Sequence, residues 1–403
     1  MADSTRFQAV IRSIQTILKE EKMDGWLLYN FRGSNVFANR LLALPEHLMF
    51  TRRYFYFIPK RGEPRKLVHR IENLHLDSLP GTKEEYISWQ SLAKGLKKLL
   101  RGAKTVAMEY SPNCAIPYVA IVDGGTVELV RKSAGVKVVS SADLVSRFEA
   151  TWDDEQMQDN AGTADHLRAV VDAAFAFIRD RINTGTPVTE YDVQQRMSQE
   201  FRARGITTNS DPNCSVNANA ANPHYEPTKE INSPIRKGDL VLLDLWAKKD
   251  KKRAVYADIT WMGYVGTSVP DEYEKVFRVL CEARDAAVDF LRQSVGKKKE
   301  IRGYEVDDVT RKVIARKGYG KYFVHRTGHS IGEEVHGNGA NMDNLETHDE
   351  RKILPMSSFS IEPGIYFSGK YGLRTEVDVV ITADRKVVVT GSAPQEHIFP
   401  ILA

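Results

Sequence analysis

Four acidic residues lie inside apolar, β-branched runs in the C-terminal half of the chain, and they form two matched pairs. Asp244 and Asp258 belong to VLLDLW and VYADIT, whereas Glu362 and Glu376 belong to FSIEPGIYF and LRTEVDVVI. The members of each pair are 14 residues apart, and His329 of TGHSIG lies between the pairs. Burying such groups without compensation is costly. Because two divalent cations would compensate them, the pattern predicts a two-metal hydrolytic site.

The ligand types also indicate which metals to expect. Carboxylate oxygens and one imidazole, without a thiolate, suit hard or borderline ions, so we expect two divalent ions, Mn²⁺ first and Co²⁺ or Zn²⁺ as alternatives. Because side chains alternate along a strand, two neighbouring strands can direct Asp244 and Asp258 to one point, and likewise Glu362 and Glu376. A single acid in a strand more often faces solvent or forms an ion pair. The prediction therefore depends on the five residues together.

The length of 403 residues indicates two domains. Up to about residue 150 the chain alternates helix-like and strand-like segments, which is typical of a small α/β domain. From Asp154 onward it contains two rounds of long helices followed by strand-like runs, and each round carries one carboxylate pair. We therefore expect an N-terminal domain at 1–150 and a catalytic α+β domain at 151–403, with a hint of internal duplication.

Charge and cysteine usage limit the partners and the compartment. A net charge of +4 gives no reason to expect nucleic acid, and the basic run KKDKKR at 248–253 is predicted to be a solvated hairpin tip between two strands. No apolar run approaches the ~20 residues that span a bilayer, so we expect no membrane partner. Cys114, Cys214 and Cys281 are scattered and odd in number, which indicates a reducing compartment, the cytoplasm.

Six segments in the C-terminal half resemble, in order, those of the pita-bread metallopeptidases. This family includes methionine aminopeptidases, prolidases, aminopeptidases P and the metal-free creatinases. The resemblance implies an α+β fold with a C-terminal pita-bread domain. The smaller α/β domain in front resembles that of creatinases, prolidases and aminopeptidases P, and it implies substrate capping and a homodimer. The matching segments are NPHYEP (222–227), LLDLW (242–246), ADIT (257–260), HRTGHSIGEEVH (325–336), SIEPGIY (360–366) and GLRTEVDVVIT (372–382).

The resemblance implies a division of labour among the metal ligands. Asp244 would bind one ion, His329 and Glu362 would bind the other, and Asp258 and Glu376 would bridge them. A hydroxide between the ions would be the nucleophile, and Glu362 would act as general base and then general acid.

Four further residues match family positions outside the ligand set. His224 resembles the residue that contacts substrate near the scissile bond, and His336 resembles the one that stabilises the tetrahedral oxyanion. His325 resembles a histidine that lines the pocket, and Arg374 resembles the arginine that hydrogen-bonds the ligand carboxylates. The remaining histidines are expected to be ordinary structural residues: His47, His69, His75, His166, His348 and His397.

The chain departs from the family pattern at two tryptophans. Trp246 stands where the family often has glycine, and Trp261 stands where it commonly has arginine, so both are expected to reshape the pocket rim.

The function that fits best is hydrolysis of the Xaa-Pro bond in dipeptides or short peptides. The alternatives are an aminopeptidase P acting on longer peptides, a creatinase-like hydrolase or lyase, and a non-catalytic binding module. The last two predict an altered ligand set, whereas this chain keeps all five residues.

Overall fold

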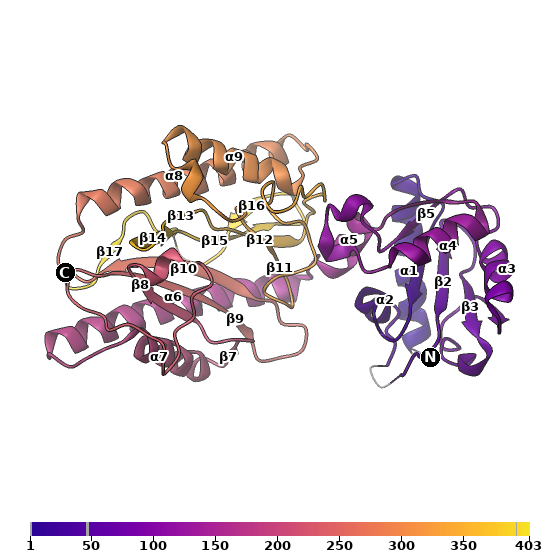
Figure 1. Cartoon of the computed structure of the whole chain (residues 1–403), viewed down its shortest axis with the longest axis horizontal. Helices are drawn as coiled ribbons and strands as arrows, with labels where there is room; N and C mark the ends of the chain where they lie inside the picture. The colour runs from indigo at the N-terminus through magenta and orange to yellow at the C-terminus, as the bar shows by residue number, and fades with distance from the viewer. Residues whose placement is uncertain (1, 46–47, 392) are drawn as a thin grey trace. The chain divides into compact units, whose positions relative to one another are not determined.

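The structure is a computed structural model that describes residues 2–45, 48–391 and 393–403, so His47 lies outside the described residues. The chain divides into two compact units, Met1–Phe148 and Glu149–Ala403. Figure 1 shows the first unit in indigo to purple and the second in magenta to yellow. Within the described residues, no helix has the length and apolar content needed to cross a membrane.

The first unit is built on one mixed sheet with the strand order β4-β3-β2-β1-β5-β6. β2 pairs antiparallel with β1 and β3, and KRGEP forms the turn between β2 and β3. The remaining pairs are parallel. The strands are β1 (Gly25–Asn30), β2 (Tyr54–Pro59), β3 (Arg65–His69), β4 (Thr82–Tyr86), β5 (Thr105–Met108) and β6 (Lys137–Ser140).

Helices cover both faces of this sheet, which explains why β1 and β2 are buried along their whole length. On one face, Ile14 of α1 packs with Leu28 and Tyr56. On the other, Leu96 of α3 packs with Leu27 and Phe57. Strands buried on both faces need apolar residues at every position. The helices are α1 (Ala2–Glu20), α2 (Val36–Leu41), α3 (Trp89–Leu99), α4 (Gly124–Ala134) and α5 (Ala142–Glu149).

The second unit places two helix pairs outside a set of strands (Figure 1). Leu167 and Phe175 of α6 pack on Leu243 of β9, whereas Leu291 of α8 packs on Phe359 of β12 and Val379 of β15. The helices are α6 (Asp154–Asn183), α7 (Glu190–Ala203), α8 (Asp271–Gly296) and α9 (Gly303–Arg316).

The strands of the second unit form two main sheets and a short hairpin. One sheet has the order β17-β10-β9-β7, with β8 also paired to β9; the other has the order β11-β12-β15-β16, and β13 pairs with β14. The strands are β7 (Ile206–Thr207), β8 (Asn213–Val216), β9 (Leu240–Lys249), β10 (Ala257–Tyr264), β11 (Ser330–Ile331), β12 (Ser357–Ile361), β13 (Gly364–Phe367), β14 (Tyr371–Arg374), β15 (Val377–Ile381), β16 (Val387–Val389) and β17 (Phe399–Pro400).

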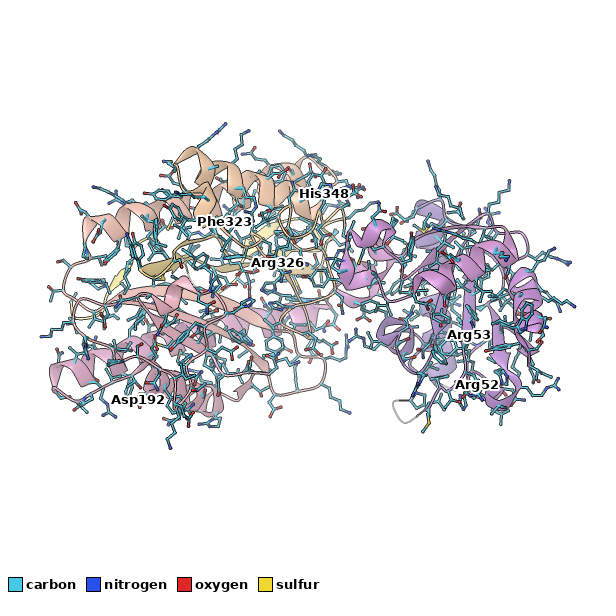
Figure 2. All side chains as sticks on the ribbon, viewed as in Figure 1. Arg52, Arg53, Asp192, Phe323, Arg326 and His348 are labelled. Carbon is cyan, nitrogen blue, oxygen red and sulfur yellow. The ribbon has the colours of Figure 1, made fainter. Side chains whose placement is uncertain are left out.

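Local signals determine where the helices of this unit begin and end. Thr189 caps α7, and its hydroxyl accepts from the backbone N–H of Asp192, which is labelled in Figure 2. Gly205 follows the helix with φ of 65°, and Gly318 follows α9 with φ of 88°. Both glycines adopt the left-handed conformation that ends helices.

The two glutamate-bearing runs differ from the prediction. FSIEPGIYF and LRTEVDVVI were each expected to be one strand, but each is divided in two, with Glu362 after β12 and Glu376 before β15. Pro363 has no N–H for a strand ladder. The neighbouring groups bond elsewhere: Glu362 N donates to Thr327 O at 2.7 Å, and Thr375 N donates to Pro363 O at 3.3 Å. Both carboxylates therefore lie at the breaks between strands.

The basic run KKDKKR does form the turn of the β9–β10 hairpin, as predicted. Its cations are not merely solvated, because they pair with acids at the start of α6. Lys249 Nζ lies 2.9 Å from Asp159 Oδ1, and Arg253 lies 2.8 Å from Asp153. The hairpin tip is thus anchored to the helix that covers the same sheet.

Candidate metal centre

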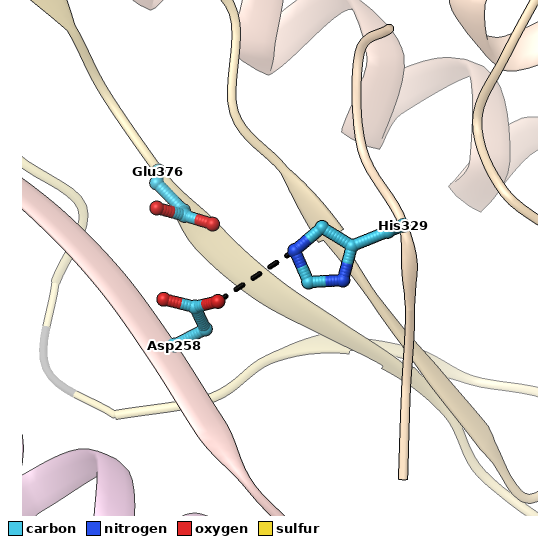
Figure 3. A group of neighbouring side chains, drawn as sticks. All are labelled: Asp258, His329 and Glu376. Atoms are coloured by element: carbon cyan, nitrogen blue, oxygen red, sulfur yellow. Dashed lines mark ion pairs between the residues drawn. The ribbon is translucent and has the colours of Figure 1, made fainter. Parts of the chain in front are cut away.

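Three buried side chains direct possible ligand atoms to one point between the two main sheets of the second unit. They are Asp258 of β10, His329 immediately before β11, and Glu376 immediately before β15 (Figure 3). Their ligand atoms lie within 4.8 Å of one another, and each residue is 4% exposed. His329 Nε2 lies 3.6 Å from Asp258 Oδ2, as the dashed line in Figure 3 shows.

The other two predicted ligands adjoin this group. Glu362 Oε1 lies 3.4 Å from His329 Nε2. Thr260 Oγ1 donates to Glu376 Oε2 at 2.6 Å and lies 3.2 Å from Asp244 Oδ1. The structure therefore brings all five predicted ligands together.

The register of β9 and β10 explains why Asp244 and Asp258 point the same way. Thr260 is paired with Asp244, and Asp258 is paired with Trp246. Residues two apart share a face of a strand, so Asp258 and Thr260 lie on the same side as Asp244. The opposite face carries Ile259 and packs against α6.

The acceptor atoms of the cluster face one another. The carbonyl of Ser330 lies 3.2 Å from His329 Nδ1, so this nitrogen carries the proton and Nε2 directs its lone pair toward the carboxylates. Burial lowers the pKa of His329 to about 3, so the ring is neutral at pH 7. Among the described residues, the buried Asp258 Oδ1 has no hydrogen-bond partner.

The acids of the cluster resist ionisation when no cation is present. Burial raises the pKa of Asp258 and of Glu376 well above the usual range, and the neighbouring carboxylates raise both further. Burial likewise raises the pKa of Asp378 to about 8. A neutral imidazole and several carboxylates around one point are a donor set for divalent cations. These residues therefore fit the metal pair that the sequence predicts.

Arg374 is the cation that the chain itself supplies. Its guanidinium pairs with Asp244, and Nε donates to Thr260 Oγ1 at 2.8 Å. Burial opposes the charge, but Asp244, Tyr366 and Glu376 together with Glu362 outweigh it and raise the pKa of Arg374. Arg374 therefore contacts Asp244 and Thr260, and its role in orienting the ligand carboxylates stays a prediction.

Close backbone packing holds His329 and Glu362 in place. His329 N donates to Ser360 Oγ at 3.0 Å, and Ser360 Oγ donates to Glu362 Oε1 at 3.1 Å. A Cβ on Gly328 would lie 1.9 Å from Ser360 O. Position 328 therefore needs glycine because a side chain there would collide with β12, and not because its backbone angles require glycine.

The predicted catalytic histidines lie in different settings. The exposed His336 ring stands edge-on to His329, with centroids 4.4 Å apart. His325 accepts from Tyr366 O–H at 2.8 Å through Nε2 and donates to Arg326 O at 2.7 Å through Nδ1. Phe323, labelled in Figure 2, packs edge-on against His325. His224 is exposed, and among the described residues no recorded contact joins its side chain to the cluster.

Sequence reasoning missed several residues around the cluster. Asp378 Oδ2 accepts from the backbone N–H of Asp258 at 2.9 Å. Two-residue spacing could have revealed Thr260 and Asp378, because each follows a predicted ligand by two positions and so shares its direction. Tyr366 carried no such signal.

The two tryptophans lie on opposite faces of the β9–β10 pair. Trp246 shares the face of Asp244, and its Nε1–H donates to Asn209 Oδ1 at 3.1 Å. Trp261 packs against the α6 core, and Arg168 lies 3.8 Å above its ring. The expectation that Trp261 reshapes the site rim is therefore wrong, since its side chain points away from the cluster.

Comparison with known proteins places these features in a family. The model of metallopeptidase family M24 matches residues 163–383. The Xaa-Pro dipeptidase of Lactobacillus helveticus is 32% identical over 235 residues, which cover 58% of this chain and 59% of that protein. The match thus spans less than two thirds of the relative.

Solved structures share the fold over almost the whole chain. Dipeptidase PepE from Mycobacterium ulcerans superposes with a TM-score of 0.66 at 20% identity and covers 98% of both chains. A prolidase from Thermococcus sibiricus superposes with a TM-score of 0.60 at 22% identity. That superposition covers 98% of this chain and 99% of the prolidase. The predicted fold, a pita-bread domain behind a smaller α/β domain, is confirmed.

Proposed function

This chain belongs to metallopeptidase family M24, and from that premise we propose that it is a metal-dependent dipeptidase that hydrolyses Xaa-Pro bonds. The observation that carries the proposal is the buried convergence of Asp258, His329 and Glu376, whose acceptor atoms face one another. The similarity to an Xaa-Pro dipeptidase over 58% of this chain supports the substrate class.

The proposed cofactor is a pair of divalent cations, with Mn²⁺ preferred and Co²⁺ or Zn²⁺ as alternatives. The residues that would hold them are Asp244, Asp258, His329, Glu362 and Glu376. When bound, such ions supply Lewis acidity and lower the pKa of a water molecule.

The neighbouring side chains keep the ligands oriented. Arg374 pairs with Asp244, and Thr260 donates to Glu376. Ser360 donates to Oε1 of Glu362, which orients that carboxylate. We assign to Glu362 the removal of a proton from water and its delivery to the leaving amine.

Three histidines complete the proposed site. His336 adjoins His329 and would donate to the oxyanion that develops on the scissile carbonyl. His325, fixed by Tyr366 and the Arg326 carbonyl, would line the pocket. His224 would contact the substrate near the scissile bond.

The assembly and the compartment are proposals as well. We propose a homodimer in which the N-terminal domain, residues 1–150, caps the substrate, on the ground of the family resemblance. We propose the cytoplasm as the compartment, because Cys114, Cys214 and Cys281, all among the described residues, are free thiols.

The function is tested by metal analysis and hydrolysis assays on one preparation. The substrates are an Xaa-Pro dipeptide, the matching Xaa-Ala dipeptide and a longer Xaa-Pro peptide, each with Mn²⁺, Co²⁺ or Zn²⁺. We expect hydrolysis of the Xaa-Pro dipeptide, with the longer peptide cleaved poorly. Preference for the longer peptide would indicate an aminopeptidase, and no cleavage of any substrate with metal bound would refute the proposal.

The variant Asp258→Asn tests the ligand assignment. It removes one charge from the centre, so we expect activity to disappear and the metal content to fall. Asp165→Asn, at an exposed position of α6, is the matched control and should retain both. Wild-type turnover by Asp258→Asn would contradict the role of this residue.

A further inference from the structure

Glu190 is a fully buried acid that the proposed mechanism does not use. It is the first residue of α7 and is 0% exposed. Its Oε1 accepts from Val216 N at 2.7 Å and from Asn219 Nδ2 at 2.9 Å. Its Oε2 accepts from Tyr225 O–H at 2.6 Å and from Ser233 N at 2.7 Å. Such a carboxylate is compensated by hydrogen bonds rather than by a cation.

The four donors all come from one stretch of chain. Val216 ends β8, and the others lie in residues 217–239, which connect β8 to β9. This connection contains a short 3-10 turn at Asn219–Ala221 and one isolated bridge, between Pro234 and Thr189. Glu190 therefore binds the beginning, the middle and the end of this connection. Long connections with so little regular structure depend on such side-chain bonds for a defined shape, and they often serve a function.

The backbone of Glu190 strengthens the attachment. Glu190 N donates to Ser233 O at 3.0 Å, and Ile235 N donates to Val188 O at 2.8 Å. Asn219 Nδ2 also reaches Ser233 Oγ at 3.0 Å, which joins the two ends of the connection directly. The connection is thus hydrogen-bonded to the start of α7, which the label of Asp192 marks in Figure 2.

The connection packs against one strand beside the candidate metal centre, and it also carries His224. A Cβ on Gly372 of β14 would lie 1.9 Å from Ala220 O, so the 3-10 turn lies directly against the strand that carries Arg374. His224 precedes Tyr225, whose hydroxyl is held by Glu190. Burial and the nearby Glu190 both raise the pKa of Tyr225, so its hydroxyl remains a donor.

We propose that Glu190 is a positioning residue that holds residues 217–234 of the connection against the site and thereby places His224 for substrate binding. This inference rests on the proposed function, because His224 matters only if the site binds a peptide. Glu190 itself touches no reacting group and acts through Tyr225 and the backbone of the connection.

The variants Tyr225→Phe and Glu190→Gln test the proposal. Tyr225→Phe removes one donor and leaves the aromatic ring, whereas Glu190→Gln places an amide N–H₂ against backbone donors. We expect hydrogen exchange of the amides in 217–234 to become about tenfold faster in Tyr225→Phe, and faster still in Glu190→Gln. Exchange in β12 and β15, and the content of bound Mn²⁺, should stay as in the wild type.

Kinetics separate positioning from general stability. Tyr225→Phe should lower kcat/KM for an Xaa-Pro dipeptide about tenfold in the wild-type background but less than twofold in a His224→Ala background. An equal loss in both backgrounds would show that Glu190 does not act through His224 and would overturn the inference. Exchange rates that stay at the wild-type value in Tyr225→Phe would overturn it as well.

Glu200→Gln is the matched control in the same helix, because Glu200 pairs with Arg196 and Arg204 and not with the connection. It should change neither the exchange of 217–234 nor kcat/KM. The exchange measurement does not depend on catalysis. A wild-type protein that cleaves no peptide would therefore refute the proposed function, while unchanged exchange in an active Tyr225→Phe enzyme would refute only the positioning role.

Discussion

At the scale of single residues, the candidate metal centre places acceptor atoms face to face with no donor of the described residues between them. Nε2 of the neutral His329 faces oxygens of Asp258 and Glu362 at 3.6 and 3.4 Å. Lone pairs at such distances repel one another in a buried setting unless a proton or a cation lies between them. The raised pKa values of Asp258 and Glu376 express the same conflict, because protonation relieves it when metal does not.

His336 should affect turnover rather than metal binding. Its exposed ring adjoins His329, and an imidazole N–H there can donate to a developing oxyanion. We expect His336→Ala to keep its ions and to lose ~10²–10³ in kcat. Metal analysis and steady-state kinetics check this. The control is His348→Ala, which removes an exposed ring that lies tilted against Tyr304. If His336→Ala loses its ions, then His336 is a ligand.

Asp378 should make the cation-free protein less stable as the pH rises. Burial raises the pKa of Asp378 to about 8, whereas an unfolded aspartate titrates near ~3.9. Between these values the folded state binds the proton more tightly, so the free energy of unfolding falls with increasing pH, by at most about 1.4 kcal/mol per pH unit.

Burial lowers the pKa values of His325 and His329, so these residues have the opposite effect: they make the free energy of unfolding rise with pH. This rise occurs mainly below their unfolded pKa of ~6.5. Between pH 7 and pH 8, the change in the free energy of unfolding therefore depends mainly on the buried acids. We expect the Tm of chelated wild-type protein to fall over this interval, and that of Asp378→Asn to fall less. Equal slopes for the two proteins would show that Asp378 does not titrate in this way.

At the scale of elements, the site is built where strands end. Glu362 and Glu376 occupy the breaks that separate the β13–β14 hairpin from β12 and β15. Asp244 and Asp258 come instead from continuous strands, whose register aligns them on one face. The segment with His329 reaches these strands only because Gly328 lets its backbone approach Ser360.

The glycines on either side of His329 should respond differently to alanine. In Gly328→Ala the new Cβ would meet Ser360 O at 1.9 Å, whereas in Gly332→Ala the nearest heavy atom is 3.9 Å away. We expect Gly328→Ala to lower the free energy of unfolding by about 1–3 kcal/mol or more and to weaken Mn²⁺ binding. Gly332→Ala should resemble the wild type. Denaturant unfolding and metal titration provide the measurement, and equal effects of both changes would contradict this packing argument.

At the scale of the whole molecule, the candidate ligands all belong to the unit Glu149–Ala403. Two rounds of paired helices and strands, α6–α7 with β9–β10 and α8–α9 with β12–β15, each supply one carboxylate pair. The internal duplication that this order of elements suggests stays a prediction, as it was from the sequence.

Removal of the cations should therefore lower the stability of the unit Glu149–Ala403 and not that of the other unit. A ligand that binds only the folded state stabilises it by about 2.7 kcal/mol at a hundred times its Kd. We expect a chelator to lower the Tm, and Mn²⁺ to restore it, with hydrogen-exchange protection restored in 149–403 and not in the described residues before 149. Protection spread equally over both units, or none, would contradict the location of the site.

Much of the local structure follows from the sequence alone. The strands of Asp244 and Asp258 form as their patterns indicate. Thr189, a capping residue, and Gly205, a helix-ending glycine, mark the limits of α7. The residue types of the metal centre could be read as well, because acids in apolar runs must be compensated. These signals are short in range, since they depend on neighbouring residues and on the periods of helix and strand.

Tertiary packing decided the rest. The sequence does not show that the run of Glu362 breaks at Pro363 and the run of Glu376 at Thr375. Nor does it show that Trp261 turns toward α6, or that Glu190 accepts from donors up to 43 positions away. Each depends on which distant segment supplies a partner for a backbone or side-chain group, and local propensity contains no such information. The chain thus determined its chemistry by residue type, whereas long-range hydrogen bonding and close backbone contact determined where that chemistry is assembled.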